Sequence, residues 1–187
     1  NPNPFEPLGI YLTYPFVIAA RGDLPFASIE ELADYSQDNG VVLGHFGAKL
    51  LPTRAAFALA KSTDINFASH AAFDALDCNT LASGDADIIT VTVQTILPCM
   101  DSITVLATFG DTSLPLAPDA PAVTEIVPDM NLSLWNGLFV HKDTPQVVRD
   151  RNTEVAESAV HSERMQKIAA QNGALIEWSD KGATEAR

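Results

Sequence analysis

The sequence is short of cysteine, of positive charge and of long apolar runs, and each shortage excludes a class of protein. It has 2 cysteines in 187 residues, and its 11 Lys and Arg stand against 24 Asp and Glu, for a net charge of −13. An acidic balance of this size repels nucleic-acid phosphates and anionic lipid headgroups. No apolar stretch approaches the roughly 20 residues of a membrane-spanning helix. We therefore expect neither nucleic-acid binding nor direct insertion into a membrane.

Catalytic and metal motifs are missing as well. The sequence contains no G-x-S-x-G, no P-loop and no H-E-x-x-H. Ser69 and His70 are neighbours in sequence, which does not place a nucleophile and a base face to face. Cys78 and Cys99 stand far apart without a C-x-x-C, so neither a metal site nor a cofactor is expected. In an exported protein the two cysteines are equally consistent with a disulfide or with two buried thiols.

The sequence does contain an alternation of strand and helix patterns. Its hydrophobic content of 47% is enough for a folded α/β body. Ser28 and Glu31 form a capping box, which predicts a helix over 29–37. Strands are expected at 9–20, 41–43, 65–68, 85–91 and 102–108, and further helices at 55–61 and 71–83. This order predicts an α/β fold with a parallel-rich sheet and helices on both faces.

The second half of the chain starts with a proline-rich excursion and ends in helices. Residues 111–128 include prolines 115, 118, 121 and 128, so we expect an extended surface segment with about one helical turn. A strand at 132–140 and helices at 144–160 and 162–171 follow, with a last short strand at 174–178. Thr144 is expected to cap the first of these helices. Trp135 is expected in the core, and Asp87 is expected to anchor backbone.

The stretch 41–51 is the first on which a function can be argued. It reads as a buried strand, a turn with two glycines and the start of a helix. Such a turn leaves backbone N–H groups unpaired at the positive end of the helix, where they can receive a phosphate or a carboxylate. The turn residues expected to bind this anion are Gly44, His45, Phe46, Gly47 and Ala48.

Five further residues are candidates for the same site. Arg54 could pair with the charge of the ligand, although an ordinary place on a helix surface is equally natural. Ser69 and His70, like Thr90 and Thr92, end predicted parallel strands, where ligands gather in such sheets. The ordinary alternatives are a solvated loop histidine for His45 and hydroxyl groups that cap the next helix for the two threonines.

Several segments together resemble the periplasmic receptors of tripartite tricarboxylate transporters, the TctC or Bug family. The resemblance covers nearly the whole chain, and the succession of segments is more specific than any one of them. The segments are FVIAARGD at 16–23, EEL at 30–32, the glycine turn, ASGDAD at 82–87, VLAT at 105–108, DAPAVTE at 119–125, WNGLF at 135–139 and TP at 144–145.

The resemblance implies a two-lobed fold like that of type II periplasmic binding proteins, with a small carboxylate bound between the lobes. It implies a periplasmic location, and the export signal is not in this chain. The partners would be a di- or tricarboxylate and the permease subunits in the membrane. The expected division is an N-terminal coil and first crossing strand at 1–13, lobe two at 14–131, and the return crossing with part of lobe one at 132–187. The resemblance further implies that most of lobe one, which precedes these residues in the family, lies outside this sequence.

Two departures from the family leave the identity of the carboxylate open. Members usually have a Ser- and Gly-rich turn with a histidine opening the helix, whereas this chain has GHFGA at 44–48, with Thr53 and Arg54 near the place of that histidine. The second family turn usually carries a tyrosine and a glycine, for which this chain has Ser69 and His70. Two alternatives to a receptor remain: the effector-binding domain of a bacterial transcription regulator, which shares this fold, and, with less support, a hydrolase.

Overall fold

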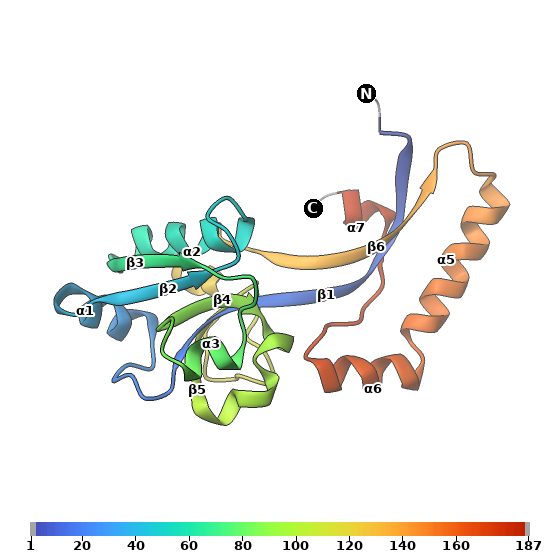
Figure 1. Cartoon of the computed structure of the whole chain (residues 1–187). Coiled ribbons are helices and arrows are strands. Elements are labelled where there is room, and N and C mark those ends of the chain that lie inside the picture. The colour runs from blue at the N-terminus through green and yellow to red at the C-terminus, as the bar shows by residue number, and fades with distance from the viewer. Residues whose placement is uncertain (1–2, 186–187) are drawn as a thin grey trace. The chain divides into compact units, whose positions relative to one another are not determined.

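The computed structural model describes residues 3–185 and divides into two compact units (Figure 1). Unit 1 comprises Asn1–Tyr14 and Leu134–Arg187, and unit 2 comprises Pro15–Ser133. Strand β1 (Phe5–Arg21) begins in unit 1 and ends in unit 2, and β6 (Ser133–His141) leads back into unit 1. The chain therefore passes between the two units twice, each time within a strand.

The sheet of unit 2 has the strand order β3-β2-β4-β1-β5. Its other strands are β2 (Val41–His45), β3 (Phe67–Ala72), β4 (Ile88–Thr92) and β5 (Ile103–Phe109). Strand β2 pairs in parallel with both β3 and β4, as the alternation of strands and helices predicted. Strand β1 lies antiparallel between β4 and β5, a reversal that was not expected. Strands β2, β3 and β4 thus end at the same edge of the sheet.

Strand β1 is longer than expected, because it begins at Phe5 within a proline-rich segment that we expected to be coil. Its first half pairs with β6 and with β7 (Ser179–Asp180), and this tertiary pairing overrides a weak local preference for strand. Pro15 stands at the boundary of the units, and the pairing with β4 and β5 begins one residue later, at Phe16. A residue without a backbone N–H is thereby kept out of the central ladder.

Helices cover both faces of this sheet (Figure 1). Helices α1 (Ile29–Asp38) and α2 (Leu51–Ser62) pack on one face. Helix α3 (Cys78–Ala82) and the 3₁₀ helices η1 (Val93–Thr95) and η2 (Leu97–Ser102) pack on the other. The first face buries Ile18, Leu32, Leu43, Leu59, Ile88 and Leu106, and the second buries Val17, Leu76, Leu81, Ile89, Val91 and Ile96. Both hydrophobic cores therefore lie in unit 2.

Several local predictions are confirmed by hydrogen bonds. The Ser28 hydroxyl accepts from the Glu31 N–H at 3.1 Å and begins α1 as expected, while the Glu31 carboxylate accepts from the N–H of Ala27 at 2.6 Å. The Asp87 carboxylate accepts from the N–H of Val42 at 2.9 Å, which is the predicted backbone anchor. The proline-rich excursion contains one short helix, α4 (Val123–Ile126), also as predicted.

The helix predicted over 71–83 is largely wrong. Strand β3 continues to Ala72, and the N–H of Phe73 then donates to the carbonyl of His45 at 2.9 Å. Helix α3 begins only after Asp77, whose carboxylate accepts from the N–H of Asn79 at 2.8 Å. An N-cap of this kind fixes where a helix starts, so the apolar pattern ahead of Asp77 does not become helical.

Unit 1 combines the start of β1 and β6 with helices α5 (Gln146–Val160), α6 (Glu163–Asn172) and α7 (Lys181–Glu185). Helix α5 begins at Gln146 with Pro145 as its N-cap and without a side-chain capping bond, so the expected cap at Thr144 is wrong. The strand expected at 174–178 is wrong, since Leu175 makes only an isolated bridge to Thr13 before β7.

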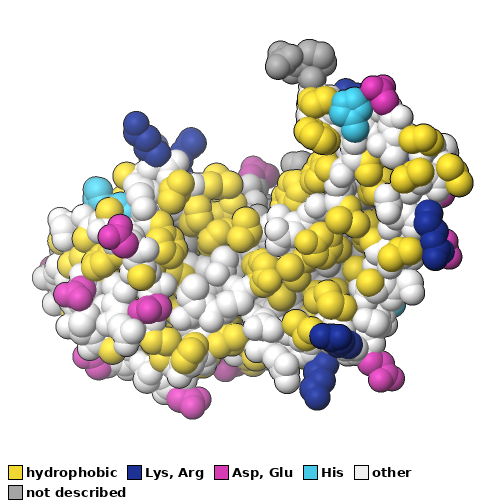
Figure 2. Space-filling model, turned by 45° about the vertical axis from the view of Figure 1, so that its right-hand side comes forward, with side chains coloured by type: hydrophobic (Ala, Val, Ile, Leu, Met, Phe, Trp, Pro, Cys, Tyr) yellow, Lys and Arg dark blue, Asp and Glu magenta, His cyan; other side chains and the backbone are white. Residues whose placement is uncertain are grey.

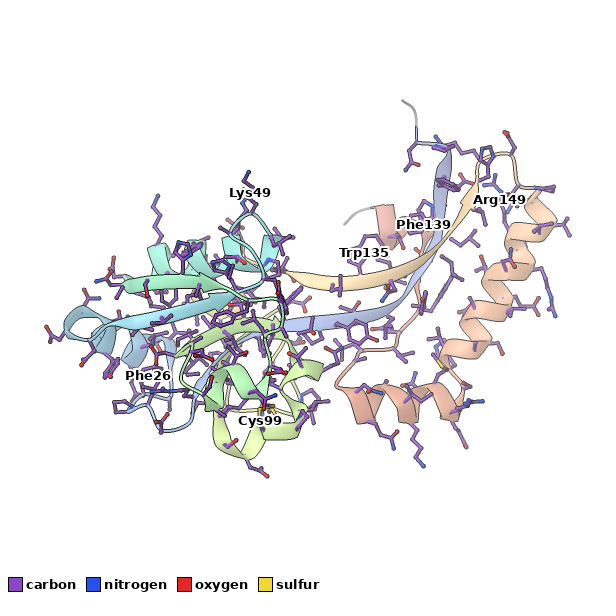
Figure 3. The ribbon with its side chains drawn as sticks, viewed as in Figure 1. Phe26, Lys49, Cys99, Trp135, Phe139 and Arg149 are labelled. Atoms are coloured by element: carbon purple, nitrogen blue, oxygen red, sulfur yellow. A yellow bond between two sulfur atoms is a disulfide. The ribbon has the colours of Figure 1, made fainter. Side chains whose placement is uncertain are left out.

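Unit 1 also exposes many apolar side chains, seen on the right-hand part of Figure 2, where Figure 1 places α5 and α6. Trp135 is 38% exposed and stacks on Phe139 with 6.2 Å between ring centroids (Figure 3), so the expectation of a core tryptophan is wrong. The other exposed large hydrophobics of this unit are Phe5, Leu134, Leu138, Val147, Val148, Val155, Ile168 and Leu175. No helix among residues 3–185 is long and apolar enough to cross a bilayer.

Cys78 and Cys99 form a disulfide, which decides between the two alternatives that the sequence left open. The bond joins α3 to η2, and its Cα atoms lie 5.8 Å apart. It closes a loop that contains the whole of β4. A crosslink of this span restricts the unfolded chain and so stabilises unit 2.

We expect the double substitution Cys78→Ala with Cys99→Ala to lower the free energy of unfolding by about 3 kcal/mol, the entropy of closing a loop of this length. Urea unfolding of the two proteins measures the difference. Dithiothreitol should reduce the stability of the natural chain by a similar amount and leave the double variant unchanged. An equal effect of the reductant on both would show that the crosslink contributes no stability.

Candidate functional site

Gly44 does not lie in a turn, which corrects the interpretation of the glycine pair. Strand β2 runs through His45, and Gly44 is paired with Ala71 on one side and Ile89 on the other. Its backbone therefore belongs to the sheet. A Cβ atom added to Gly44 would lie 2.9 Å from the Cβ of Ala86 and 3.1 Å from Leu76, so the missing side chain permits close packing.

We expect Gly44→Ala to lower the free energy of unfolding by about 1–3 kcal/mol, because the added methyl group overpacks the core. Gly40→Ala is the matched control, since a Cβ there would meet only the Cβ of Ala68 at an ordinary 3.6 Å. Chemical denaturation of both variants tests the difference. If the two substitutions have equal effects, Gly44 is not a packing glycine.

The turn itself consists of Phe46, Gly47 and Ala48, followed by the start of α2. The N–H of Leu50 donates to the Gly47 carbonyl at 3.1 Å, and the first intrahelical bond runs from Arg54 to Leu50 at 3.0 Å. No side chain of the described residues caps α2, and its first turn carries no acidic residue. The positive end of this 12-residue helix therefore presents backbone N–H groups that precede its first hydrogen bond, those of Leu51 and Thr53.

His45 and His70 meet across β2 and β3. Nε2 of His45 lies 2.9 Å from Nδ1 of His70, and the ring centroids are 5.0 Å apart. The ring of Phe57 on α2 packs edge-on against His70 at 5.3 Å, so the pair lies on the face that α2 covers. His45 is only 3% exposed, whereas His70 is exposed on the edge strand. Both residues are strand residues, and neither is in the turn that the sequence predicted.

Ser69 is separated from this pair, although it precedes His70 directly. Both lie inside β3, where successive side chains point to opposite faces of the sheet. Because the ring of His70 contacts α2, the Ser69 hydroxyl is directed to the other face. The structure therefore does not bring Ser69 to the candidate site.

Thr90 stands beside His45 on the next strand. The register pairs Leu43 with Ile88 and Gly44 with Ile89, so its continuation sets Thr90 next to His45. Alternation places both on the face of Leu43, the one covered by α2. Thr90 is 2% exposed, and neither its Oγ1 nor Nδ1 of His45 has a hydrogen-bond partner among residues 3–185. Buried polar groups without a partner cost about 1–3 kcal/mol each, and such groups call for an explanation.

Thr92 and Gln94 complete this end of β4. Thr92 is the last strand residue and precedes η1, but its hydroxyl makes no capping bond. Gln94 was not among the predicted residues, and its side-chain Oε1 is buried and also lacks a partner within the described chain. The signal that could have found it was a polar amide directly after a buried parallel strand. These three unpartnered polar atoms thus lie on, or shortly after, the neighbouring strands β2 and β4.

Burial lowers the pKa of His45 below its ordinary value of 6.5, and the charge of His70 lowers it further. A histidine with a lowered pKa stays neutral near pH 7. Because the unfolded chain takes up this proton at a higher pH than the folded chain, stability rises with pH and is lost as the pH falls below about 6.5.

The region around the pair is basic, although the protein as a whole is acidic. Residues 40–73 contain Lys49, Arg54 and Lys61 but only one acidic residue, Asp64. Lys49 and Arg54 are exposed, and neither forms an ion pair with an acidic side chain within 3–185. Figure 3 shows Lys49 pointing away from the sheet at the turn before α2, and Figure 2 shows basic side chains near a histidine on that part of the molecule.

Two surface hollows lie away from these residues. One, of about 460 Å³, lies between α1 and the end of α2 and is lined by Glu30, Asp34 and Asp64, which repel an anion. The other, of about 240 Å³, lies in unit 1 beside Glu6 and Arg149. The candidate site is instead defined by the helix end and the unpartnered groups beneath it.

Residues 4–182 match the pattern of the tripartite tricarboxylate transporter family receptor, TctC. The chain belongs to this family. The match covers most of the chain, including both units and the turn before α2, and it confirms the resemblance found in the sequence. No curated protein sequence matches this TctC-family chain.

Solved structures share the fold of this TctC-family chain. The periplasmic binding protein BugD is 24% identical with a TM-score of 0.73 over 97% of this chain and 64% of its own. The R. palustris protein Rpa4515 with adipate is 15% identical, with a TM-score of 0.77 over 98% of this chain and 64% of its own. MatC (Rpa3494) from Rhodopseudomonas palustris with bound malate is 18% identical, with a TM-score of 0.70 over 92% and 60%. The TctC-family chain therefore spans less than two thirds of each of these proteins.

Proposed function

We propose that this TctC-family chain carries the anion-binding lobe of a periplasmic receptor that captures a small di- or tricarboxylate. The observation that carries the proposal is the uncapped amino end of α2, together with buried unpartnered groups of His45 and Thr90 on the sheet face beneath this helix. Each of these groups lacks the hydrogen-bond partner that a carboxylate supplies.

The electrostatics of this lobe support an anion and not a cation. The amino end of a helix carries about half a positive charge, and anions bind there through backbone N–H groups. Lys49 and Arg54 add two exposed positive charges next to it. Because the rest of the chain is strongly acidic, an anion would be repelled from most of the surface and attracted to this part.

The comparisons support the ligand class only through family and fold. Rpa4515 and MatC were solved with adipate and malate, two small dicarboxylates. At identities of 15% and 18% they support the fold, so the assignment of a carboxylate to this chain rests on the chemistry at α2. The family name supports membrane permease subunits as the partner that receives the ligand. The Cys78–Cys99 disulfide suits an oxidising compartment such as the periplasm.

Catalysis has little support in this arrangement. A hydrolase would need a nucleophile hydrogen-bonded to a base, and the side chains of Ser69 and His70 are directed to opposite faces of β3. A transcription regulator would share the fold, but the chain matches the receptor family over 4–182. A binding function remains the interpretation that the geometry supports best.

We expect malate and adipate to raise the melting temperature of the chain in proportion to the logarithm of their concentration. Arg54→Gln should weaken this binding about tenfold, because a charge-assisted hydrogen bond is lost. Lys61→Gln is the matched control, since Lys61 lies in the last turn of the same helix and should not affect binding. Calorimetry or thermal shift measures all three proteins.

Two results would contradict the proposal. The first is a chain that neither dicarboxylate stabilises at millimolar concentration. The second is an equal loss of binding in the two variants, which would show a response to net charge and not to a site at the amino end of α2.

A further inference from the structure

The contact between His45 and His70 holds one proton between two rings. The nitrogens lie 2.9 Å apart, so one must donate and the other accept. In the neutral pair, His70 can donate to His45, which leaves the proton of His45 on its unpartnered Nδ1. Alternatively His45 donates to His70, and Nδ1 of His45 is then a bare acceptor. Only the first arrangement places a donor at Nδ1 of His45, where it can bond to a carboxylate.

One additional proton removes this ambiguity. With the shared proton still between the rings, a protonated pair carries N–H on Nδ1 of His45 and on Nε2 of His70 in every arrangement. It also carries a positive charge. A carboxylate at Nδ1 of His45 would therefore favour the protonated pair both by a hydrogen bond and by charge.

No acidic side chain among the described neighbours pairs with these histidines, so a bound carboxylate would be the group that favours their protonation. On the turn and α2 the charged side chains are Lys49, Arg54 and Lys61, which disfavour protonation of the free pair. On the segment after β3, Asp77 is used as the cap of α3 and Asp74 is exposed. Before β4, Asp87 accepts from Val42 and pairs with Arg21 at 3.5 Å. No ion pair of an acidic side chain with either histidine occurs among residues 3–185.

We propose that His45 and His70 act as one proton-sharing pair that couples carboxylate capture to the uptake of a proton. This inference rests on the carboxylate site proposed above and adds its regulation. Binding and protonation favour each other reciprocally, so the affinity rises as the pH falls. The change is at most tenfold per pH unit, between the pKa of the free pair and the higher pKa of the occupied pair.

The test is an NMR titration of the side-chain nitrogens of all four histidines between pH 5 and 8.5, with and without malate at constant ionic strength. We expect malate to raise the midpoint of the His45 titration by about one pH unit. His141 and His161, which lie in unit 1, are controls in the same sample and should not shift. In His70→Gln the malate affinity should lose its pH dependence above pH 6, whereas His161→Gln should retain it.

The outcomes separate this inference from the proposed function. If malate shifts the backbone amides of Leu51 and Thr53 but leaves the titration of both histidines unchanged, proton coupling is wrong and the carboxylate site stands. If neither the amides nor the histidines respond, both proposals fail. An equal shift of all four histidines would reflect a general ionic effect and would also overturn the coupling.

Discussion

The parallel pairing of β2 with β3 and β4 is the constraint on which the candidate site depends. Because these strands run in one direction, His45 and Thr90 reach the same edge of the sheet, and the chain leaving β2 must turn there into α2. The positive end of α2 is thereby set at the end of β2, where the unpartnered groups are buried. A shift of β2 or β4 by one residue would turn His45 or Thr90 to the face that α3 covers, and the site would no longer form.

Close packing holds this register in place. Gly44 lets the segment with Ala86 approach β2, and the carboxylate of Asp87, the residue before β4, accepts a hydrogen bond from the backbone of Val42. The disulfide restrains the two ends of the segment that contains β4. Both cores lie in unit 2, so the cost of leaving polar atoms of His45, Thr90 and Gln94 unpartnered is offset by the surrounding apolar burial.

Local signals in the sequence predicted the elements whose causes are local. The cap at Ser28, the helical turn within the proline-rich segment and the strand at β6 depend on neighbouring residues, and the structure confirms them. The reversal of β1 and the contact of His45 with His70 depend on pairing between distant segments, which periodicity does not encode. Gly44 was misread for the same reason, because the atoms that require a glycine belong to Leu76, Ala86 and Ile89. The roles of the candidate residues in ligand binding remain predictions.

An acidic protein that captures an anion must overcome the electrostatic repulsion of its own carboxylates. The distribution of charge shows how this chain can do so. At physiological ionic strength, exposed charges are screened over about 8 Å, so acidic residues elsewhere on the surface act weakly at α2. Helix N–H groups, Lys49 and Arg54 act at contact distance, where screening is slight. The histidine pair proposed above extends this principle, because between the pKa of the free pair and the higher pKa of the occupied pair it gains a positive charge when the carboxylate binds.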